Sequence, residues 1–249
     1  MLSKNKIKYI RSLELKKKRK EEQVFVAEGH KLVGDLLGHF PCKLLIATSN
    51  WLKMNHSATA NEIIEVTQEE LSRASLQKTP QEVLAVFVQP SYDLNPEVIK
   101  SSLCLALDDV QDPGNLGTIF RTAEGAGMSA VIMSAGCVDL FNPKVVRATM
   151  GAIFRLPFFI TENMTKEAER LKQEHFSVYA ASLEGARLYT EETYEGKCAV
   201  IIGNEANGIK QETQQAATHK IKIPMEGQLE SLNAAVSAAL FMYEIHRNR

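Results

Sequence analysis

Polar side chains follow apolar strands at three places in the second half of the chain. They are Asn115 and Arg121, Glu205 and Asn207, and Ser231 and Asn233. Amide, hydroxyl, carboxylate and guanidinium groups bind polar ligands through hydrogen bonds and ion pairs. The nearby glycines lack the Gly-x-Gly-x-x-Gly spacing of a dinucleotide site, which argues against a nicotinamide-dependent oxidoreductase.

The first of these loops lies within DDVQDPGNLGTIFRTAEGAG, residues 108–127. Pro113-Gly114 predicts a type II turn in which the glycine takes a positive φ, and Asn115 is then expected to cap a helix. Apolar residues recur at helical spacing after it, at Leu116, Ile119, Phe120, Ala123 and Ala126. Arg121 points away from that stripe. Most arginines on a polar helix face are only solvated, but the helix start at a strand's carboxyl end favours ligand binding here.

The second loop, IIGNEANGI, follows an apolar strand that ends at Gly203. Glycine at that point allows close approach of a ligand to the backbone. Glu205 and Asn207 are common turn residues, so an ordinary turn and a functional loop both remain open.

The last helix, which follows the third loop, is apolar on nearly all faces. Pro224 ends a short strand before it, and Ser231 stands where a helix N-cap is expected. The polar residues Asn233, Ser237 and Glu244 share one narrow stripe. Such a helix must be buried nearly all round. We therefore expect its own domain to cover one side and a second subunit another.

Strands and helices alternate along the whole chain, which predicts an α/β protein. Expected strands are 24–27, 43–47, 63–66, 82–88, 103–110, 130–136, 176–182, 198–204 and 221–224. Those in the second half are apolar almost throughout, as in parallel strands covered on both faces. They predict a doubly wound sheet whose ligand lies beyond the carboxyl ends of the strands. The proline-containing segment 89–97 predicts a boundary between domains 1–95 and 96–249.

The first 20 residues carry nine basic side chains against one acidic. Ile7, Ile10 and Leu13 at helical spacing predict a helix over 7–20. A solvated helix with one apolar stripe is the plain interpretation. The alternative is a phosphate-binding arm, because KKKRK at 16–20 carries more positive charge than solubility needs.

The net charge of −1 conceals an uneven distribution. Residues 1–95 hold 14 Lys and Arg against 11 Asp and Glu, whereas the remainder holds 15 against 19. No apolar run approaches the ~20 residues of a membrane span, and the charged N-terminus does not resemble a secretory signal. The cysteines lie in or beside apolar runs without metal or redox spacing, at Cys42, Cys104, Cys137 and Cys198. We expect them to be reduced core residues of a cytoplasmic protein that has no metal site.

Three motifs in order resemble those of the SpoU/TrmH family of RNA 2′-O-ribose methyltransferases. The motifs are Asn115-x-Gly117-x-x-x-Arg121, Gly203-x-Glu205-x-x-Gly208 and, over 223–236, IPM-x-G-x-x-x-SLN-x-x-V. The stretch 141–158 is similar to the family's segment between the first two motifs. FVAEGHKLV and SLQKTPQEVLAVF in the first part are similar to its N-terminal substrate-binding domain, so the resemblance covers nearly the whole chain.

This resemblance implies a SPOUT-type parallel sheet with a deep trefoil knot, preceded by a smaller α/β RNA-binding domain. It also implies a homodimer that forms through the final helix. S-adenosylmethionine would lie in the knot, held by three loops. The positions that match the family's cofactor site are Ala181, Ser182, Gly203, Ile223, Met225 and Leu232.

The implied reaction is in-line displacement of a sulfonium methyl group by a ribose 2′-hydroxyl. Arg121 matches the arginine that acts either as base or as a clamp on the neighbouring phosphate. We favour the clamp, because arginine stays protonated and can bind phosphate bidentately. Asn115 and Asn233 are expected to orient the ribose, and Ser231 matches a further polar motif position. Glu205 is expected to position Arg121 or Asn115, or to take part in proton transfer.

Ribosomal RNA is the expected substrate and transfer RNA the alternative. A catalytically silent RNA-binding or ribosome-assembly protein would not need the methyl-transfer residues, whose presence argues against it. Because the catalytic half is net negative, RNA binding is expected to depend on the N-terminal domain and on Arg121, Arg147 and Arg155.

Overall fold

The computed structural model describes residues 2–90, 103–184 and 186–248. The chain forms two compact units, one of Met1–Ser91 with Asp139–Phe154 and the other of Tyr92–Val138 with Arg155–Arg249. The first unit is thus assembled from two separate stretches of sequence. The boundary expected over 89–97 lies largely outside the described residues, so the division at residue 95 stays a prediction.

The first unit is built on a four-stranded mixed sheet. Its strands are β1 (Val24–Glu28), β2 (Cys42–Thr48), β3 (Ile63–Val66) and β4 (Val83–Val88), in the order β1-β4-β2-β3. Its helices are α1 (Lys4–Ser12), α2 (Lys16–Glu22), α3 (His30–Leu36), α4 (Ser49–Met54), α5 (Gln68–Ala74), α7 (Pro143–Ala148) and most of α8 (Ala152–Arg155). All four expected strands are confirmed, as is the capping box that begins α5, between Thr67 and Glu70.

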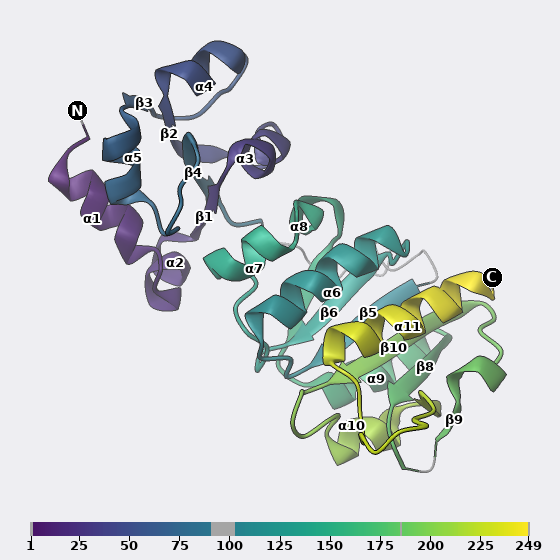
Figure 1. Ribbon diagram of the computed structural model, residues 1–249. Coiled ribbons are helices and arrows are strands. Elements are labelled where there is room, and N and C mark those ends of the chain that lie inside the picture. The colour runs from purple at the N-terminus through teal and green to yellow at the C-terminus, as the bar shows by residue number, and fades with distance from the viewer. Residues whose placement is uncertain (1, 91–102, 185, 249) are drawn as a thin grey trace. The chain divides into compact units, whose positions relative to one another are not determined.

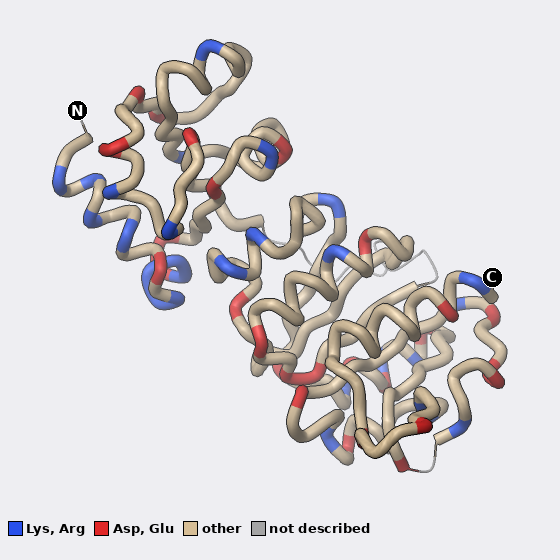
Figure 2. Tube along the Cα trace, in the orientation of Figure 1, with Lys and Arg blue, Asp and Glu red and all other residues tan. Residues whose placement is uncertain are grey.

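The helix expected over 7–20 is wrong, because the chain forms two helices there, α1 and α2. Leu13, just after α1, is fully buried. Arg19, from the basic run, is also buried, at 1 % exposure. Its guanidinium donates to the carboxylate of Asp139 and to the carbonyl oxygens of Leu13 and Glu14. A buried charge needs such partners to offset its lost hydration. Figure 2 shows Lys and Arg along both helices, so the segment remains basic.

The second unit contains a seven-stranded sheet in which all neighbouring strands are parallel. Its strands are β5 (Leu103–Asp108), β6 (Ala130–Ser134), β7 (Phe158–Thr161), β8 (Phe176–Ala181), β9 (Arg187–Leu188), β10 (Lys197–Gly203) and β11 (His219–Lys222). They are ordered β7-β6-β5-β10-β8-β11-β9. Its helices are α6 (Pro113–Gly125), α9 (Met164–Gln173), the short 3-10 helix η2 (Tyr189–Glu191), α10 (Gln211–Ala216) and α11 (Ala234–Arg247).

Helices cover both faces of this sheet, which confirms the doubly wound expectation. In Figure 1, α6 and α11 lie side by side over one face, and α9 and α10 lie together on the other. The central strand β10 is therefore buried from Cys198 to Gly203, which explains its continuous apolar sequence. Because the strands are parallel, the loops after β5, β8, β10 and β11 leave the sheet at the same edge.

The expected start of α6 is wrong. The helix begins at Pro113, and Gly114 has no positive φ, so there is no type II turn. Asp112 is the N-cap, and its Oδ1 accepts from the N–H of Asn115 at 2.7 Å. Proline is favourable in the first turn because an N–H there has no helical acceptor.

The expected cap of α11 is also wrong. Asn233, rather than Ser231, is the N-cap, and its Oδ1 accepts from the N–H groups of Ala235 and Val236. Both residue types are good caps, so the type of residue alone could not choose between positions two residues apart. Ser231 is left in the preceding loop.

Four elements of the second unit have no counterpart among the expected ones: β7, α9, the two-residue β9 and the 3-10 helix η2. α9 did carry a signal, because Asn163 caps it and Met164, Ala168 and Leu171 form a buried helical stripe. Every helix in the described part of the chain is too short or too polar to span a bilayer.

Candidate functional site

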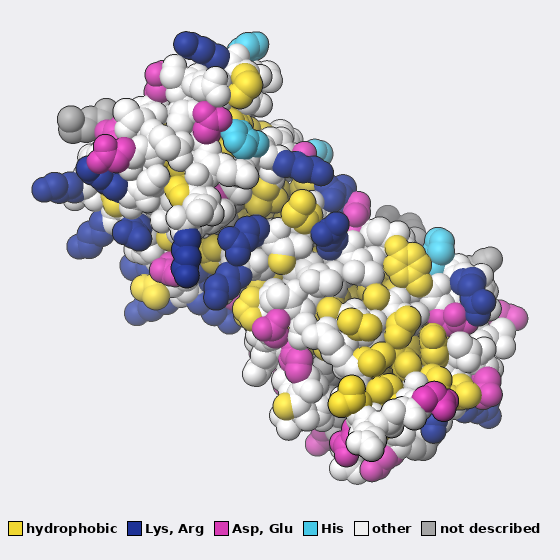
Figure 3. Space-filling model, viewed as in Figure 1, with side chains coloured by type: hydrophobic (Ala, Val, Ile, Leu, Met, Phe, Trp, Pro, Cys, Tyr) yellow, Lys and Arg dark blue, Asp and Glu magenta, His cyan; other side chains and the backbone are white. Residues whose placement is uncertain are grey.

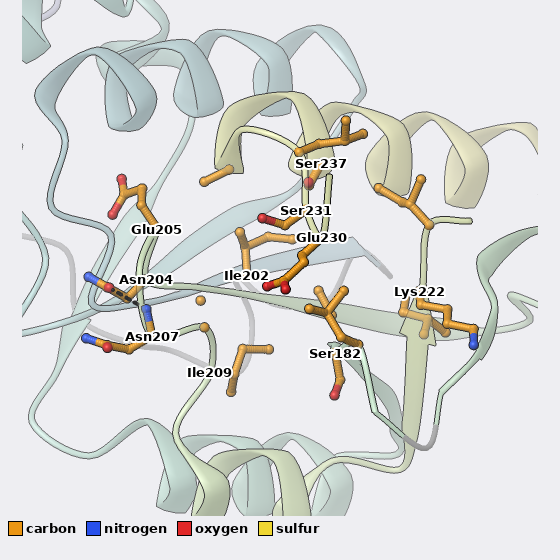
Figure 4. A pocket seen from close by; sticks show the side chains of 18 of the residues that line it. Ser182, Ile202, Asn204, Glu205, Asn207, Ile209, Lys222, Glu230, Ser231 and Ser237 are labelled. Carbon is orange, nitrogen blue, oxygen red and sulfur yellow. Dashed lines mark hydrogen bonds between the residues drawn. The ribbon is translucent and has the colours of Figure 1, made fainter. Parts of the chain in front are cut away.

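A cavity of 440 Å³ opens at the carboxyl edge of the seven-stranded sheet. Its walls come from the loops after β8, β10 and β11 and from the first turns of α11 (Figure 4). All positions assigned to a cofactor from the sequence line it: Ala181, Ser182, Gly203, Ile223, Met225 and Leu232. Of the residues assigned to catalysis, Glu205 and Ser231 also line it, whereas Asn115, Arg121 and Asn233 do not.

Gly203, at the end of β10, has no space for a side chain. A Cβ atom there would lie 2.2 Å from the carbonyl carbon of Gly208 and 2.3 Å from the nitrogen of Ile209. The close neighbour of such a Cβ is the chain's own returning backbone. The approach of a ligand to the backbone of Gly203 stays a prediction. Only glycine lets the loop after β10 fold back against the strand that it has just left.

Asn204 holds this returning loop in shape. Its backbone exchanges two hydrogen bonds with Gly208, at 3.0 and 2.9 Å. Its Oδ1 accepts from the N–H groups of Ala206 and Asn207, and its Nδ2 donates to the carbonyl oxygen of Asp109 at 2.8 Å. Asn207 contributes only its N–H to these contacts, as an ordinary turn residue would. Asn204 was not predicted from the sequence, and no pattern in the neighbouring residues indicated its role.

Three predicted site residues from three different loops form one hydrogen-bonded chain. Asn233 Nδ2 donates to Asn115 Oδ1 at 2.9 Å, and Asn115 Nδ2 donates to Glu205 Oε1 at 2.9 Å. The Glu205 carboxylate also accepts from the N–H groups of Asp112 at 3.1 Å and Gln111 at 3.2 Å. The structure therefore joins residues separated by 90 and 118 positions in the sequence.

The donor-to-acceptor direction of these hydrogen bonds is fixed at both ends of the series Asn233–Asn115–Glu205. Asn233 Oδ1 accepts from the first N–H groups of α11, so its Nδ2 is the atom that faces Asn115. At the other end an ionised Glu205 can only accept, so Asn115 must turn its Nδ2 toward it. Asn115 is thereby held in one orientation, with one amide hydrogen and one lone pair left for a ligand.

Glu205 is the electrostatic anchor of the network. Partial burial raises the pKa of its carboxyl group, but the hydrogen bonds from Asn115 and from the backbone of Gln111 and Asp112 outweigh burial. The net pKa of Glu205 lies below its ordinary value. The group is therefore a carboxylate at neutral pH and a weak proton acceptor.

Arg121 lies on the exposed face of α6, opposite the buried residues Leu116, Ile119, Phe120 and Ala123. The stripe expected from the sequence is thus confirmed. Arg121 is about 9 Å further along the helix axis than Asn115. Across the described residues its guanidinium makes no hydrogen bond or ion pair, so the structure does not bring it into the network. Arg155, also expected to bind RNA, donates to Glu124 at 2.7 Å, and its contact with RNA stays a prediction.

Asp112 is a further residue that sequence reasoning missed. It caps α6, and its N–H donates to Glu205, so it positions both the helix and the carboxylate. The signal was present, because an aspartate directly before a proline is a common helix start.

The charged side chains that line the cavity are mostly acidic. Glu184, Glu205 and Glu230 face one cation, Lys222. Figure 4 shows Glu205 and Lys222 at opposite ends of the view, with Glu230 and Ser231 between them. A surface of this charge favours a ligand with positive groups.

Comparison with known proteins agrees with this geometry. The SpoU rRNA Methylase family matches residues 102–243, and the MRM3-like substrate binding domain matches residues 4–85. The chain belongs to the SpoU rRNA methylase family. It is therefore an RNA methyltransferase, and S-adenosylmethionine is its methyl donor.

The similar proteins extend over nearly the full length. A Bacillus subtilis protein, 23S rRNA (guanosine(2553)-2′-O)-methyltransferase RlmP, is 32 % identical over 96 % of this chain and 95 % of its own. An rRNA methyltransferase from Sinorhizobium meliloti, crystallised with S-adenosylmethionine, is 30 % identical, with a TM-score of 0.86 over 99 % of this chain and 96 % of its own. A TrmH-family chain from Porphyromonas gingivalis reaches 37 % identity and a TM-score of 0.89, with complete coverage of both chains.

The cavity of this SpoU methylase suits S-adenosylmethionine on physical grounds. Its volume of 440 Å³ lies within the ~300–1,000 Å³ of small-molecule sites. Its acidic lining complements the sulfonium and ammonium groups of the cofactor. Backbone of the three loops and the aliphatic side chains of Ile202, Ile209 and Leu232 provide the polar and apolar walls that an adenosine requires.

Proposed function

We propose that this SpoU methylase transfers a methyl group to a ribose 2′-hydroxyl of ribosomal RNA. The observation that carries the proposal is the chain Asn233–Asn115–Glu205, which is preorganised beside the cofactor cavity. The similarity to RlmP, named for 2′-O-methylation of 23S rRNA, supports ribosomal RNA over the transfer RNA alternative.

We assign the two asparagines to orienting the ribose. S-adenosylmethionine supplies an activated methyl group, so the protein must place the 2′-hydroxyl in line with it. The free amide hydrogen and lone pair of Asn115 are directed by its neighbours, and Asn233 retains a second amide hydrogen. Ser231 presents its hydroxyl from the cavity wall.

Glu205 acts as a positioning residue in this scheme. Its carboxylate already accepts from Asn115 and from two backbone N–H groups, and its lowered pKa makes it a poor base. Of the roles left open by the sequence, the contacts favour the positioning of Asn115 over both proton transfer and the positioning of Arg121.

Arg121 serves as the phosphate clamp. Its guanidinium is exposed and has no ion-pair partner in the described ranges, so no internal contact must break before it binds RNA. A fixed positive charge beside the 2′-hydroxyl also lowers the pKa of that hydroxyl, which promotes its reaction as a nucleophile.

The active form is a homodimer that buries the outer face of α11. One face of this helix packs inside its own unit, with Ala238, Phe241 and Met242 buried. On the opposite face, Val236 is 49 %, Leu240 37 % and Tyr243 52 % exposed. Figure 3 shows apolar side chains gathered over this region. Such a patch is typical of a protein interface.

The proposal also includes the trefoil knot around the cofactor. It includes a cytoplasmic location as well, which is supported by four buried free cysteines.

The deciding experiment is incubation with a labelled methyl donor and total RNA, followed by separation of rRNA from tRNA. We expect label in the 2′-O position of rRNA, and a loss of about 10²–10³-fold in rate for Arg121→Ala. Lys172→Ala, on an exposed surface of α9, is the control and should match the wild type. Label in tRNA alone, or in neither RNA, would contradict the proposal, and an unchanged rate in Arg121→Ala would remove that residue from the mechanism.

A further inference from the structure

A second cavity, of 310 Å³, lies wholly within the first unit. It is formed by β1, the start of α3, the loop after α5, and α7. The helix α7 packs against β1, although more than 100 residues separate them in the sequence. The cavity thus combines segments matched by the substrate-binding domain, residues 4–85, with a helix from the segment matched by the methylase family. Neither segment alone contains it.

The rim of this cavity carries three exposed cations, Lys78, Lys144 and Arg147. Within the described part of the protein, none of them forms an ion pair. Other lysines of the same unit do have partners, such as Lys43, which contacts Glu22 at 2.9 Å. Unpaired cations gathered at one opening favour a ligand with negative charge.

The floor of the cavity carries a buried carboxylate. Glu28 is 8 % exposed. It accepts from the hydroxyl of Ser75 and from the N–H of Leu76 at 2.9 Å. An ionised carboxylate can accept about four hydrogen bonds, so half of its capacity is left for a ligand. Apolar side chains of Leu32, Leu76 and Val146 form the walls around it.

Cations at the opening, apolar walls and an acceptor at the floor match the parts of one nucleotide. We propose that this cavity binds an unstacked guanosine of the RNA substrate, with its phosphates at Lys78, Lys144 and Arg147 and its base edge at Glu28. Guanine presents two adjacent N–H donors to a carboxylate, whereas adenine and the pyrimidines do not. Unpaired bases bound in this way are a usual means of recognising RNA sequence.

The proposal rests on the assignment of this SpoU methylase to RNA, and it deepens that assignment by naming an anchoring nucleotide. Because every lining residue belongs to the first unit, the cavity serves recognition rather than methyl transfer. It would therefore determine which RNA is bound without touching the cofactor.

The test is binding of the full chain to fluorescently labelled hexauridylate and to the same oligomer with one central guanosine, inosine or adenosine. We expect guanosine to bind about tenfold more tightly than uridine. Inosine, which lacks the 2-amino group, should lose part of that gain. This comparison changes only the ligand, so it tests the Glu28 contact even if a Glu28 variant folds poorly. Equal affinities for all four oligomers would overturn the proposal.

Two variants test the protein side. Glu28→Gln should remove the preference for guanosine while leaving affinity for hexauridylate unchanged. Arg147→Ala should lower the affinity for all oligomers by the same factor and reduce the slope of log K against log salt by about 1. Lys53→Ala, an exposed lysine of α4 away from the cavity, is the matched control. A guanosine preference that survives Glu28→Gln, or equal behaviour of Arg147→Ala and Lys53→Ala, would contradict the assignment.

Failure of this inference and failure of the proposed function can be told apart. A wild-type chain that methylates rRNA but shows no guanosine preference overturns only the nucleotide cavity. A chain that prefers guanosine through Glu28 but methylates no RNA supports the cavity and overturns the proposed reaction.

Discussion

The cavity that we assign to the cofactor and the cavity that we assign to a nucleotide have linings of opposite charge. Three glutamates and one lysine line the cofactor cavity, whereas two lysines, an arginine and one glutamate line the cavity of the first unit. A cationic cofactor and a polyanionic substrate need different surroundings. The excess of acidic residues after position 95 is therefore compatible with RNA binding under our proposals, in which the cations that bind RNA lie in the first unit and on the exposed face of α6.

Glu28 and Glu205 show how burial and hydrogen bonds together set the pKa of a carboxyl group. Burial raises the pKa of Glu28, and the hydrogen bonds from Ser75 and Leu76 and the charge of Arg147 do not offset it. Burial also raises the pKa of Glu205, but this residue is exposed whereas Glu28 is buried, and more donors surround its carboxylate. Its net pKa is therefore lowered. Ionisation of the carboxyl group is thus favoured at Glu205 and opposed by burial at Glu28.

The largest effect on the reaction rate is expected from substitution of Asn115, the central residue of the series Asn233–Asn115–Glu205. Asn115→Ala should lower kcat by about 10²–10³-fold, because both Glu205 and Asn233 lose their partner and the ribose loses its orientation. Affinity for S-adenosylmethionine, measured by calorimetry, should not change. Asn5→Ala, at an exposed position of α1, is the control. A parallel loss of cofactor affinity would assign Asn115 to the cavity instead.

Gly203→Ala should affect stability and cofactor binding together. The new Cβ would clash with the backbone at Gly208, and overpacking of this kind costs about 3 kcal/mol of unfolding free energy. For a chain of this size Tm should fall by roughly 6–12 °C. Gly227→Ala is the matched control, because its Cβ meets no atom within 4 Å. Equal Tm values for the two variants would show that the returning loop can move aside.

The basic N-terminal segment should affect RNA binding through salt dependence. Deletion of residues 1–20 would remove buried Leu13 and Arg19 and damage the first unit, so substitution is the sharper test. Replacement of Lys16, Lys17 and Lys20 by glutamine should make the slope of log K against log salt shallower by about 2. The same change at Lys166, Lys172 and Lys220 of the second unit should have little effect. Similar slopes for both triple variants would remove the segment from RNA binding.

The smallest expected effect is on the free energy of unfolding, to which Glu205 and Glu28 contribute with opposite pH dependence. The pKa of Glu205 is lowered by folding, so its stabilisation is complete above its unfolded pKa and is lost as pH falls below 4.5. The pKa of Glu28 is raised, so its contribution is most favourable below 4.5 and is lost as pH rises through the folded pKa. Urea unfolding of Glu205→Gln and Glu28→Gln from acid to neutral pH should show differences from wild type that change in opposite directions. Parallel profiles would show that the two environments are equivalent.

Much of the second unit was predictable from local pattern. Apolar runs identified β5, β6, β8 and β10, and the spacing around Leu116 and Phe120 identified the buried side of α6. The family resemblance then assigned residues from three loops to one site. The positions assigned to the cofactor all line one cavity, and Asn115, Glu205 and Asn233 share one hydrogen-bond network. The roles of all these residues, like those of Arg121 and Ser231, stay predictions.

The sequence by itself determined which residues are available: the apolar strands, the glycine after β10, and the amides and carboxylate of the three loops. Only the tertiary structure decided that Asp139 neutralises Arg19 and that α7 completes a cavity on β1. It also decided that the backbone of Gly208 packs so closely against Gly203 that no side chain fits there. Helical and strand periodicity is a local property of the backbone, readable over a few residues. These contacts, apart from the tight turn at Gly203, join positions about 120 residues apart, and packing of whole elements selects them.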